Sequence, residues 1–161
     1  MMAHSIPEYQ IRPFQTRDAQ QIAQLFHDTV HNINIQDYSS SQVQAWAPDQ
    51  INVRDWATDC VNYFTYVADL NGTIIGFGEL AANGYIRCFY CHHQYQGCGV
   101  GRQIYQAIES QALQQQQSRL FTEASITAKP FFERMGFSVV QEQCVARGGE
   151  LFINYLMEKL L

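Results

Sequence analysis

The residues with the clearest chemical implication are the glycines of a Gln-Gly-Cys-Gly-Val-Gly-Arg run at positions 96–102. A strand-like segment at residues 85–91 precedes the run, and a helix-like segment from about Val100 to Gln114 follows it. Glycines let the backbone approach a ligand closely, and the first N–H groups of a helix have no intrahelical partner at the positive end of its dipole. The run therefore predicts a site for a diphosphate-bearing ligand, formed by Gln96, Gly97, Cys98, Gly99, Val100, Gly101 and Arg102.

The spacing of these glycines does not fit two other phosphate-binding motifs. A P-loop needs Lys and then Ser or Thr after its last glycine, but Arg102 and Gln103 follow Gly101. A dinucleotide-binding fold needs Gly-x-Gly-x-x-Gly near the start of a βαβ unit, whereas Gly97-x-Gly99-x-Gly101 lies in the second half of the chain. The alternative is a glycine-rich connection that binds no ligand, in which Arg102 faces solvent instead of neutralising phosphate.

The composition is that of a folded, acidic protein. A chain of 161 residues with 47% hydrophobic and 16% charged residues suits a single domain over residues 1–161. The net charge of -5 argues against nucleic acid as the main partner and is compatible with a cationic small molecule or a peptide amine. No apolar run reaches the roughly 18 residues of a membrane span, and residues 1–7 lack the pattern of a signal peptide. We therefore expect no membrane partner and a cytoplasmic location.

The five cysteines predict reduced thiols and no metal site. Cys88 and Cys91, followed by two histidines, resemble half of a zinc site, but no second cysteine pair is present. Residues three apart on a strand also point to opposite faces. Cys98 precedes a helix N-terminus, which could lower its pKa, and an acyl-cysteine route is a weaker alternative. His92 and His93 are expected on the surface, with phosphate binding or base catalysis as the alternative.

Hydrophobic periodicity and turn residues predict one α/β domain with a mostly antiparallel sheet and room for parallel pairing around residues 85–124. Asn71-Gly72 is a strong hairpin signal, and Asn83-Gly84 predicts a second turn. Strands are predicted at residues 9–14, 63–70, 73–80, 85–91, 120–124, 137–146 and 150–157. Helices are predicted at residues 16–31 with Thr16 as the cap, 41–47, 53–60, 100–114 and 126–135.

Essentially the whole chain resembles the GNAT family of N-acetyltransferases. In that family a Gln/Arg-x-x-Gly-x-Gly/Ala pattern binds the pyrophosphate of acetyl-CoA, and Gln96-x-x-Gly99-x-Gly101 matches it. Residues 125–137 partly match a second family segment, in which Asn-x-x-Ala is followed by an aromatic pair, Glu and Gly-Phe. Residues 38–46 and 124–134 are similar to the YafP-like acetyltransferases. The resemblance implies the GNAT (acyl-CoA N-acyltransferase) fold, with a central mixed, mostly antiparallel sheet and flanking helices. It implies acetyl-CoA as cosubstrate.

The resemblance assigns further residues to the cofactor. The backbone around Phe89, Tyr90 and Cys91 is expected to donate an N–H to the oxyanion of the tetrahedral intermediate. Ser125 stands where the family usually has Asn, and it offers one hydroxyl instead of an amide. Phe132 stands where the family usually has a Tyr that protonates the departing thiolate, so its expected role is steric. A thiolate with a pKa near 8.5 leaves tolerably well without an acid.

Two carboxylates are candidates for the general base. Attack of a primary amine on a thioester needs a neutral amine and a base that takes its proton. Glu123 lies two residues before Ser125 on a strand end, so the two share a face. Glu79, at the end of a hairpin strand, is the second candidate. Tyr85 and Tyr155 could replace the missing acid, and packing in the core is the alternative for both.

The leading hypothesis is transfer of an acetyl group from acetyl-CoA directly to a primary amine of a small molecule. The alternatives are a catalytically weak acyl-CoA-binding sensor and an acetyltransferase that acts on a peptide N-terminus or lysine. Trp46 and Trp56, with Tyr38 and Phe64, are expected either to wall the acceptor pocket or to pack in the core. The strand at residues 150–157 is apolar enough to pair with a second copy, which would give a homodimer.

Overall fold

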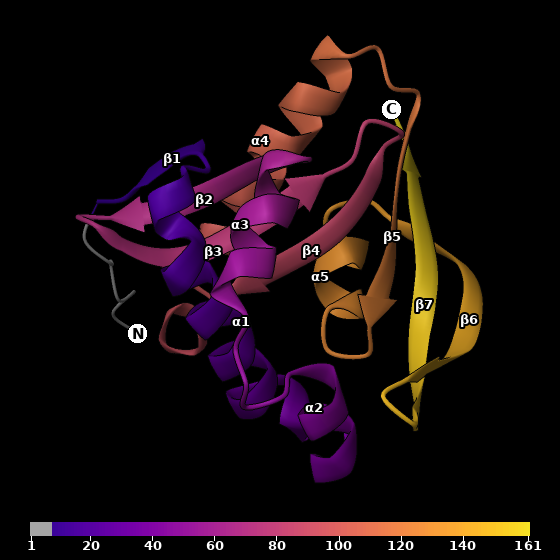
Figure 1. The fold of residues 1–161 in the computed structure, drawn as a ribbon. Helices are drawn as coiled ribbons and strands as arrows, with labels where there is room; N and C mark the ends of the chain where they lie inside the picture. Colours follow the sequence, from indigo (N-terminus) through magenta and orange to yellow (C-terminus); the bar gives the residue numbers. More distant parts are fainter. Residues whose placement is uncertain (1–7) are drawn as a thin grey trace, which may run out of the picture.

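A computed structural model describes residues 8–161 as a seven-stranded mixed sheet with helices on both faces (Figure 1). The strand order is β1-β2-β3-β4-β5-β7-β6, and β4–β5 is the parallel pair among otherwise antiparallel neighbours. The strands are β1 Gln10–Pro13, β2 Phe64–Leu70, β3 Thr73–Leu80, β4 Tyr85–Cys91, β5 Arg119–Ser125, β6 Ser138–Arg147 and β7 Glu150–Leu160. The helices are α1 Ala19–Asn32, α2 Ser40–Trp46, α3 Val53–Val61, α4 Val100–Gln114 and α5 Lys129–Arg134. Short 3-10 turns lie at η1 Thr16–Asp18, η2 Asn34–Gln36 and η3 His93–Tyr95.

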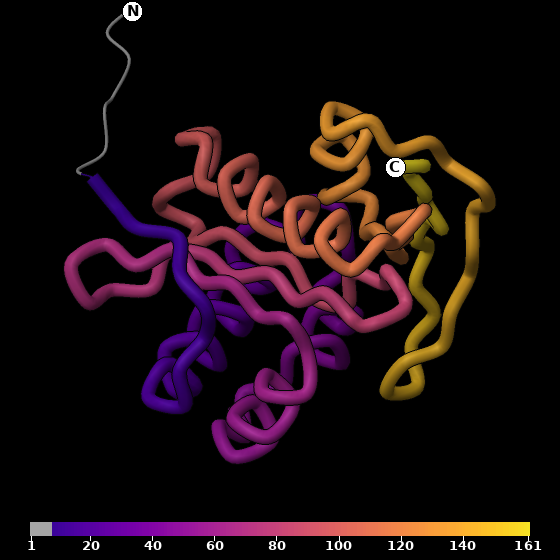
Figure 2. Tube along the Cα trace, turned by 90° about the horizontal axis from the view of Figure 1, so that it is seen from above, coloured from indigo at the N-terminus to yellow at the C-terminus, as the bar shows by residue number. Residues whose placement is uncertain are grey.

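The sheet separates two hydrophobic layers. Helix α4 packs on one face, over β2 and β3, and α1 and α3 cover the other face (Figure 2). Each helix is amphipathic, so it buries its apolar stripe against the sheet and leaves its polar side in water. None of the helices in the described residues combines the length and the apolar character that a membrane crossing needs.

Two glycines let α4 lie close to β3. A Cβ on Gly76 would come within 2.8 Å of Ile104 Cδ1, and one on Gly78 within 2.8 Å of Ile108 Cδ1. Both isoleucines are fully buried. Side chains at these two strand positions would push the helix away, so the glycines fix the height of α4 above the sheet. The N-terminus of α4 is thereby held next to the end of β4.

Strands β4 and β5 pair only at their beginning. The parallel register contains Tyr85↔Phe121 and Ile86↔Thr122 and stops there, although β4 continues to Cys91. On its other side, β4 carries one extra residue relative to β3 between the pairs Leu80↔Ile86 and Gly78↔Phe89, which is a β-bulge. A bulge bends its strand and increases the local twist. The two strands meet near the top of Figure 1 and diverge downward from this point.

The predicted elements are confirmed, with three corrections. Thr16 does not cap the first helix, because Asp18 accepts the Gln15 N–H at 2.8 Å and the chain makes a 3-10 turn before α1. Asp18 is held there by Arg12, whose guanidinium makes two 2.8 Å hydrogen bonds to it. The helix predicted from residue 126 begins at Lys129. Ser125 Oγ accepts the Ala128 N–H, and residues 126–128 form a turn before the helix.

The third correction concerns the last strand. The expectation that residues 150–157 pair with a second copy does not fit the sheet, because β7 lies between β5 and β6 and pairs with both. The register from Arg119↔Leu160 to Ser125↔Asn154 pairs residues 154–160 of β7 with β5. The sheet edges are β1 and β6. Strand β7 is therefore not free to form a homodimer by pairing with a second copy.

The close approach of α4 predicts the effect of adding a side chain beneath it. We expect Gly78→Val to lower the free energy of unfolding by about 1–3 kcal/mol, the usual cost of overpacking, because its Cβ meets Ile108 and Ile104. Urea unfolding followed by circular dichroism measures this. Ile108→Ala should destabilise the Gly78→Val protein less than it destabilises the original protein, since it removes the clashing methyl group. Equal costs in the two backgrounds would show that the helix is not held by this contact.

Candidate active site

Two cavities lie on either side of the place where β4 and β5 part. The first, here called the glycine-loop cavity, has a volume of about 450 Å³ and is lined by residues 96–97 and 99–102 together with β4, β5 and α5. The second, here called the aromatic cavity, has a volume of about 430 Å³ and lies among α1, α2, α3 and the β6–β7 hairpin. Five residues line both cavities: Trp46, Arg87, Tyr90, Glu123 and Ser125. A ligand in one cavity can therefore meet a ligand in the other at these residues.

The glycine loop has the backbone that the sequence predicts. Gly97 and Gly99 have φ of +71° and +84°, and Gly99 is the N-cap of α4. A Cβ on either would meet no atom within 4 Å, so these residues border open space. Gly101 faces the protein instead, where a Cβ would lie 3.0 Å from the Phe131 ring. The Gln96 side chain ties the loop to β4 by donating to the Cys91 carbonyl at 2.7 Å.

Eleven of the twelve predicted cofactor residues line this cavity. They are Phe89, Tyr90, Cys91, Gln96, Gly97, Gly99, Val100, Gly101, Arg102, Ser125 and Phe132. Cys98 is not among the lining residues, and its Sγ lies 3.6 Å from the Gln96 carbonyl. Val100, the first residue of α4, is buried, and Arg102 in the first turn of the same helix is exposed.

Strand β4 presents main-chain donors to the cleft. The His92 N–H donates to the Ile75 carbonyl at 2.9 Å, and Tyr90 pairs with Phe77, so these residues direct their backbone groups toward β3. Backbone groups alternate between the two edges of a strand. The N–H groups of Phe89 and Cys91 therefore point to the opposite edge, where β5 has parted from β4.

Ser125 and Phe132 lie at the inner end of the glycine-loop cavity. Ser125 Oγ accepts the Ala128 N–H at 3.0 Å, which begins the turn into α5. Phe132 is 2% exposed and packs edge-to-face against Phe89 and Phe137, with ring centroids 5.7 and 5.1 Å apart. A phenyl ring at this position has no proton to donate, so its contribution here is packing.

Glu123 stands where the two cavities meet, with two donors on its carboxylate. The Tyr85 hydroxyl donates to Oε1 at 3.2 Å, and the Gln143 amide donates to Oε2 at 3.3 Å. Burial and the neighbouring Glu123 carboxylate raise the pKa of Tyr85 to about 12. Tyr85 therefore keeps its proton at neutral pH and remains a donor to Glu123. Glu123 and Ser125 both face the cleft, as expected from their spacing.

Glu79 lies in a different setting, inside the sheet. Its side chain is fully buried and lines neither cavity. Oε2 accepts from Arg87 Nε at 2.7 Å, and Oε1 accepts from Cys60 Sγ at 3.3 Å. Arg87 also contacts Asp59 at 3.2 Å. A buried carboxylate held by a guanidinium in this way orients Arg87 at the cleft.

The two cysteines of β4 and the two histidines that follow it do not gather at one point. Cys88 packs with the cluster beneath α1 and α3, and Cys91 packs with the cluster beneath α4, so they lie on opposite faces as predicted. Burial raises the pKa of both thiols, that of Cys91 to about 12, which keeps them protonated. His92 Nδ1 accepts the Gln94 N–H at 3.1 Å, and burial together with His93 lowers its pKa.

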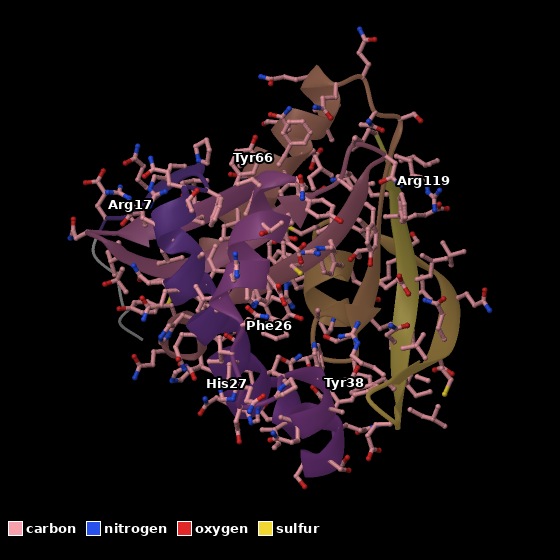
Figure 3. All side chains as sticks on the ribbon, viewed as in Figure 1. Arg17, Phe26, His27, Tyr38, Tyr66 and Arg119 are labelled. Atoms are coloured by element: carbon pink, nitrogen blue, oxygen red, sulfur yellow. The ribbon has the colours of Figure 1, made fainter. Side chains whose placement is uncertain are left out.

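Sequence reasoning identified part of the aromatic cavity and missed its charges. Of the two expected roles, Trp46, Trp56 and Tyr38 have the first, since they line the cavity, and Phe64 has the second, since it packs in the core under α4. The complete aromatic set is Phe26, Tyr38, Trp46, Trp56, Tyr85, Tyr90 and Phe152. Figure 3 labels two of these aromatic residues, Phe26 on α1 and Tyr38. The missed charged residues are Asp55, Asp59, Arg87 and Arg147. The spacing of Asp55 and Asp59, one helical turn apart around Trp56, was the available signal.

The Tyr85–Glu123 contact predicts a measurable titration. We expect Glu123→Gln to lower the pKa of Tyr85 below about 12, because the substitution removes a nearby negative charge and leaves burial as the main cause that raises it. Ultraviolet phenolate titration measures the change, with Tyr85→Phe identifying the signal. Glu142→Gln, on the exposed face of β6, is the matched control and should leave the titration unchanged. A Tyr85 pKa that does not respond to Glu123→Gln contradicts the contact.

Comparison with known proteins identifies the family. Residues 34–159 match the acetyltransferase (GNAT) domain family. The chain is 35% identical over 148 residues to the uncharacterized N-acetyltransferase YafP of Escherichia coli K12, covering 92% of this chain and 93% of YafP.

Solved structures show the same fold. A GCN5-related N-acetyltransferase from Rhodopseudomonas palustris superposes with a TM-score of 0.91 at 29% identity, over 99% of this chain and all of the other. PaiA N-acetyltransferase from Thermoplasma acidophilum, solved in complex with coenzyme A, superposes with a TM-score of 0.79 at 16% identity, over 96% of this chain and all of the other. With its parted β4 and β5 and the glycine loop before α4, the chain is a member of the GNAT family of N-acetyltransferases.

Proposed function

We propose that this protein moves the acetyl group of acetyl-CoA directly to a primary amine of a small molecule. Acetyl-CoA occupies the glycine-loop cavity, and the amine enters from the aromatic cavity. The observation that carries the proposal is that the two cavities share Glu123, Ser125 and Tyr90 between the parted strands. The coenzyme A complex of PaiA, which has the same fold, supports this choice of cosubstrate.

The glycine loop suits the diphosphate of the cofactor. Gly97 and Gly99 border open space, so phosphate oxygens can approach the N–H groups at the start of α4. Arg102 adds a positive charge to the rim of the same cavity. The thioester end then reaches the inner part of the cavity, between the β4 main chain and Phe132.

The chemical step balances with the groups at the cleft. An acceptor that arrives as its ammonium ion first releases one proton to water. The neutral amine then attacks the thioester carbonyl, a C–N bond forms, and the oxyanion accepts a hydrogen bond from an N–H of Phe89 or Cys91. The C–S bond then breaks, and the electron pair leaves with the thiolate of coenzyme A. The amine loses one proton to Glu123, directly or through one water. The thiolate leaves with a pKa near 8.5, so the absence of a hydroxyl on Phe132 is tolerated.

Glu123 fits the role of base better than Glu79. Its carboxylate is exposed at the junction of the cavities and is oriented by Tyr85 and Gln143. Glu79 remains the second candidate, but its carboxylate is engaged by Arg87 inside the protein. A proton transferred to Glu79 would break a buried ion pair, which is costly.

Substitution of Gly99 tests the cofactor site. We expect Gly99→Glu to abolish acetyl-CoA binding measured by calorimetry, because the new carboxylate fills the open space of the loop and repels the diphosphate. Gly149→Glu is the matched control: Gly149 has a similar φ of +80° and equally open surroundings, but it lies in the β6–β7 turn. It should bind acetyl-CoA like the original protein. Retained binding by Gly99→Glu would exclude this site.

Substitution of Glu123 tests the base. We expect Glu123→Gln to lower kcat about 100-fold at neutral pH, within the usual contribution of a general base, and to leave the Kd for acetyl-CoA unchanged. Coenzyme A thiol release with an accepted amine measures kcat. Glu142→Gln should keep full activity, since Glu142 is exposed on β6 outside both cavities. Full activity of Glu123→Gln combined with loss in Glu79→Gln would transfer the role to Glu79.

Thiol release also distinguishes the alternatives. A protein that binds acetyl-CoA but acetylates no amine would be an acyl-CoA sensor, a function favoured by Phe132, which supplies no acid, and by Ser125, which replaces the usual Asn. Phe132→Tyr would then be the informative variant. Transfer to peptides but not to small amines would indicate a protein acetyltransferase.

A further inference from the structure

The walls of the aromatic cavity are aromatic rings. Phe26 contacts Trp56 and Tyr90, with ring centroids 5.0 and 5.1 Å apart. Trp46 contacts Tyr38 and Phe152 at 5.3 and 6.0 Å, and Phe26 and Tyr90 also pack against the cluster that contains Tyr38 and Phe152. These rings come from α1, α2, α3, β4 and β7, together with the segment before α2, so they hold one another in fixed orientations. Aromatic side chains fixed in this way suit a flat apolar body packed against them.

The charges at the cavity favour a cation. Among the described residues that line it, Asp55, Asp59 and Glu123 carry negative charge, and Arg87 and Arg147 carry positive charge. The Arg87 charge is already matched by the buried Glu79 at 2.7 Å. Arg87 also pairs with Asp59 at 3.2 Å, so four carboxylates meet two guanidinium groups here and the balance of charge is negative. An ammonium group is attracted both by these carboxylates and by the electron-rich faces of the rings.

The hydroxyl groups of Tyr38 and Ser125 are engaged with the main chain. Tyr38 donates to the Ile153 carbonyl at 2.7 Å and accepts the Ile126 N–H at 2.9 Å. Ser125 Oγ accepts the Ala128 N–H at 3.0 Å. These two hydroxyls therefore contribute little to binding an acceptor, and its polar partners are the charged residues and Asn154. A carboxylate on the acceptor would meet Asp55, Asp59 and Glu123, which have the same charge.

We propose that the acceptor is a primary amine on a short alkyl chain attached to an aromatic ring, without a carboxylate. The ring packs against the aromatic side chains that line the cavity, and the amine points toward Glu123. A volume of about 430 Å³ accommodates a molecule of this size. This inference rests on the proposed function, because it assigns the aromatic cavity to the acceptor.

Both tryptophans of the chain line this cavity, so their fluorescence reports binding directly. We would titrate the full chain with 2-phenylethylamine, phenylalanine, 2-phenylethanol and spermidine, and confirm each Kd by calorimetry. These probes separate the ring, the amine and the carboxylate. We expect 2-phenylethylamine to bind at least about tenfold more tightly than the other three, the effect of one additional ion pair or of one like-charge repulsion avoided. Equal or tighter binding of spermidine or phenylalanine overturns the proposal.

A charge-removing variant tests the carboxylates. Asp55→Asn should weaken 2-phenylethylamine binding about tenfold, again the scale of one ion pair, and leave 2-phenylethanol binding unchanged. Asp49→Asn is the control, because Asp49 is exposed and outside the cavity. Trp56→Leu should weaken the binding of both probes. If Trp56→Leu does not fold by circular dichroism, the Asp55 variant decides alone, and an unchanged Kd for 2-phenylethylamine in it overturns the proposal.

Acetyl transfer separates this inference from the proposed function. Transfer to spermidine or to an amino sugar, but not to 2-phenylethylamine, overturns the acceptor class and keeps the N-acetyltransferase. Tight binding of 2-phenylethylamine at the cavity without acetyl-CoA binding overturns the proposed function and keeps the recognition of arylalkylamines.

Discussion

The site depends on one feature of the sheet: strands β4 and β5 separate after the pair Ile86↔Thr122. The bulge between β3 and β4 bends β4 at this point, and α4 is held next to its end by the close approach at Gly76 and Gly78. The opening leaves main-chain donors of β4 unpaired with β5 and places the glycine loop at one side of them. The aromatic cavity reaches the other side. Two ligands can meet because a hydrogen-bonded ladder is interrupted.

Electrostatic roles divide between two glutamates that look alike in the sequence. Glu79 is sealed inside the sheet and fixes Arg87, whereas Glu123 remains in the cleft with two neutral donors on its oxygens. A base needs access to the proton it takes, and a buried ion pair loses stability when it is protonated. Phe132 contributes packing and has no proton to transfer, so proton transfer depends on other groups.

Local signals in the sequence predicted most of the fold and most of the residues that line the glycine-loop cavity. Asn71-Gly72 located a hairpin, and the glycines at 97, 99 and 101 located the start of α4 with its open loop. These features are short-range. The position of β7 between β5 and β6, the burial of Glu79 and the fact that Cys98 does not line the cavity depend on long-range pairing and packing, which periodicity does not contain. Asp55 and Asp59 could be connected with a cavity only once α3 was placed beside β4 and the last hairpin.

The most direct test of the account is a crystal structure of the protein with coenzyme A and an amine bound together. The account predicts the diphosphate at the N–H groups of residues 97–102, the sulfur between β4 and β5 beside Phe132, and the amine nitrogen between that sulfur and Glu123. Binding of coenzyme A outside the glycine-loop cavity, or of the amine on the same side of the sheet as the diphosphate, would contradict it.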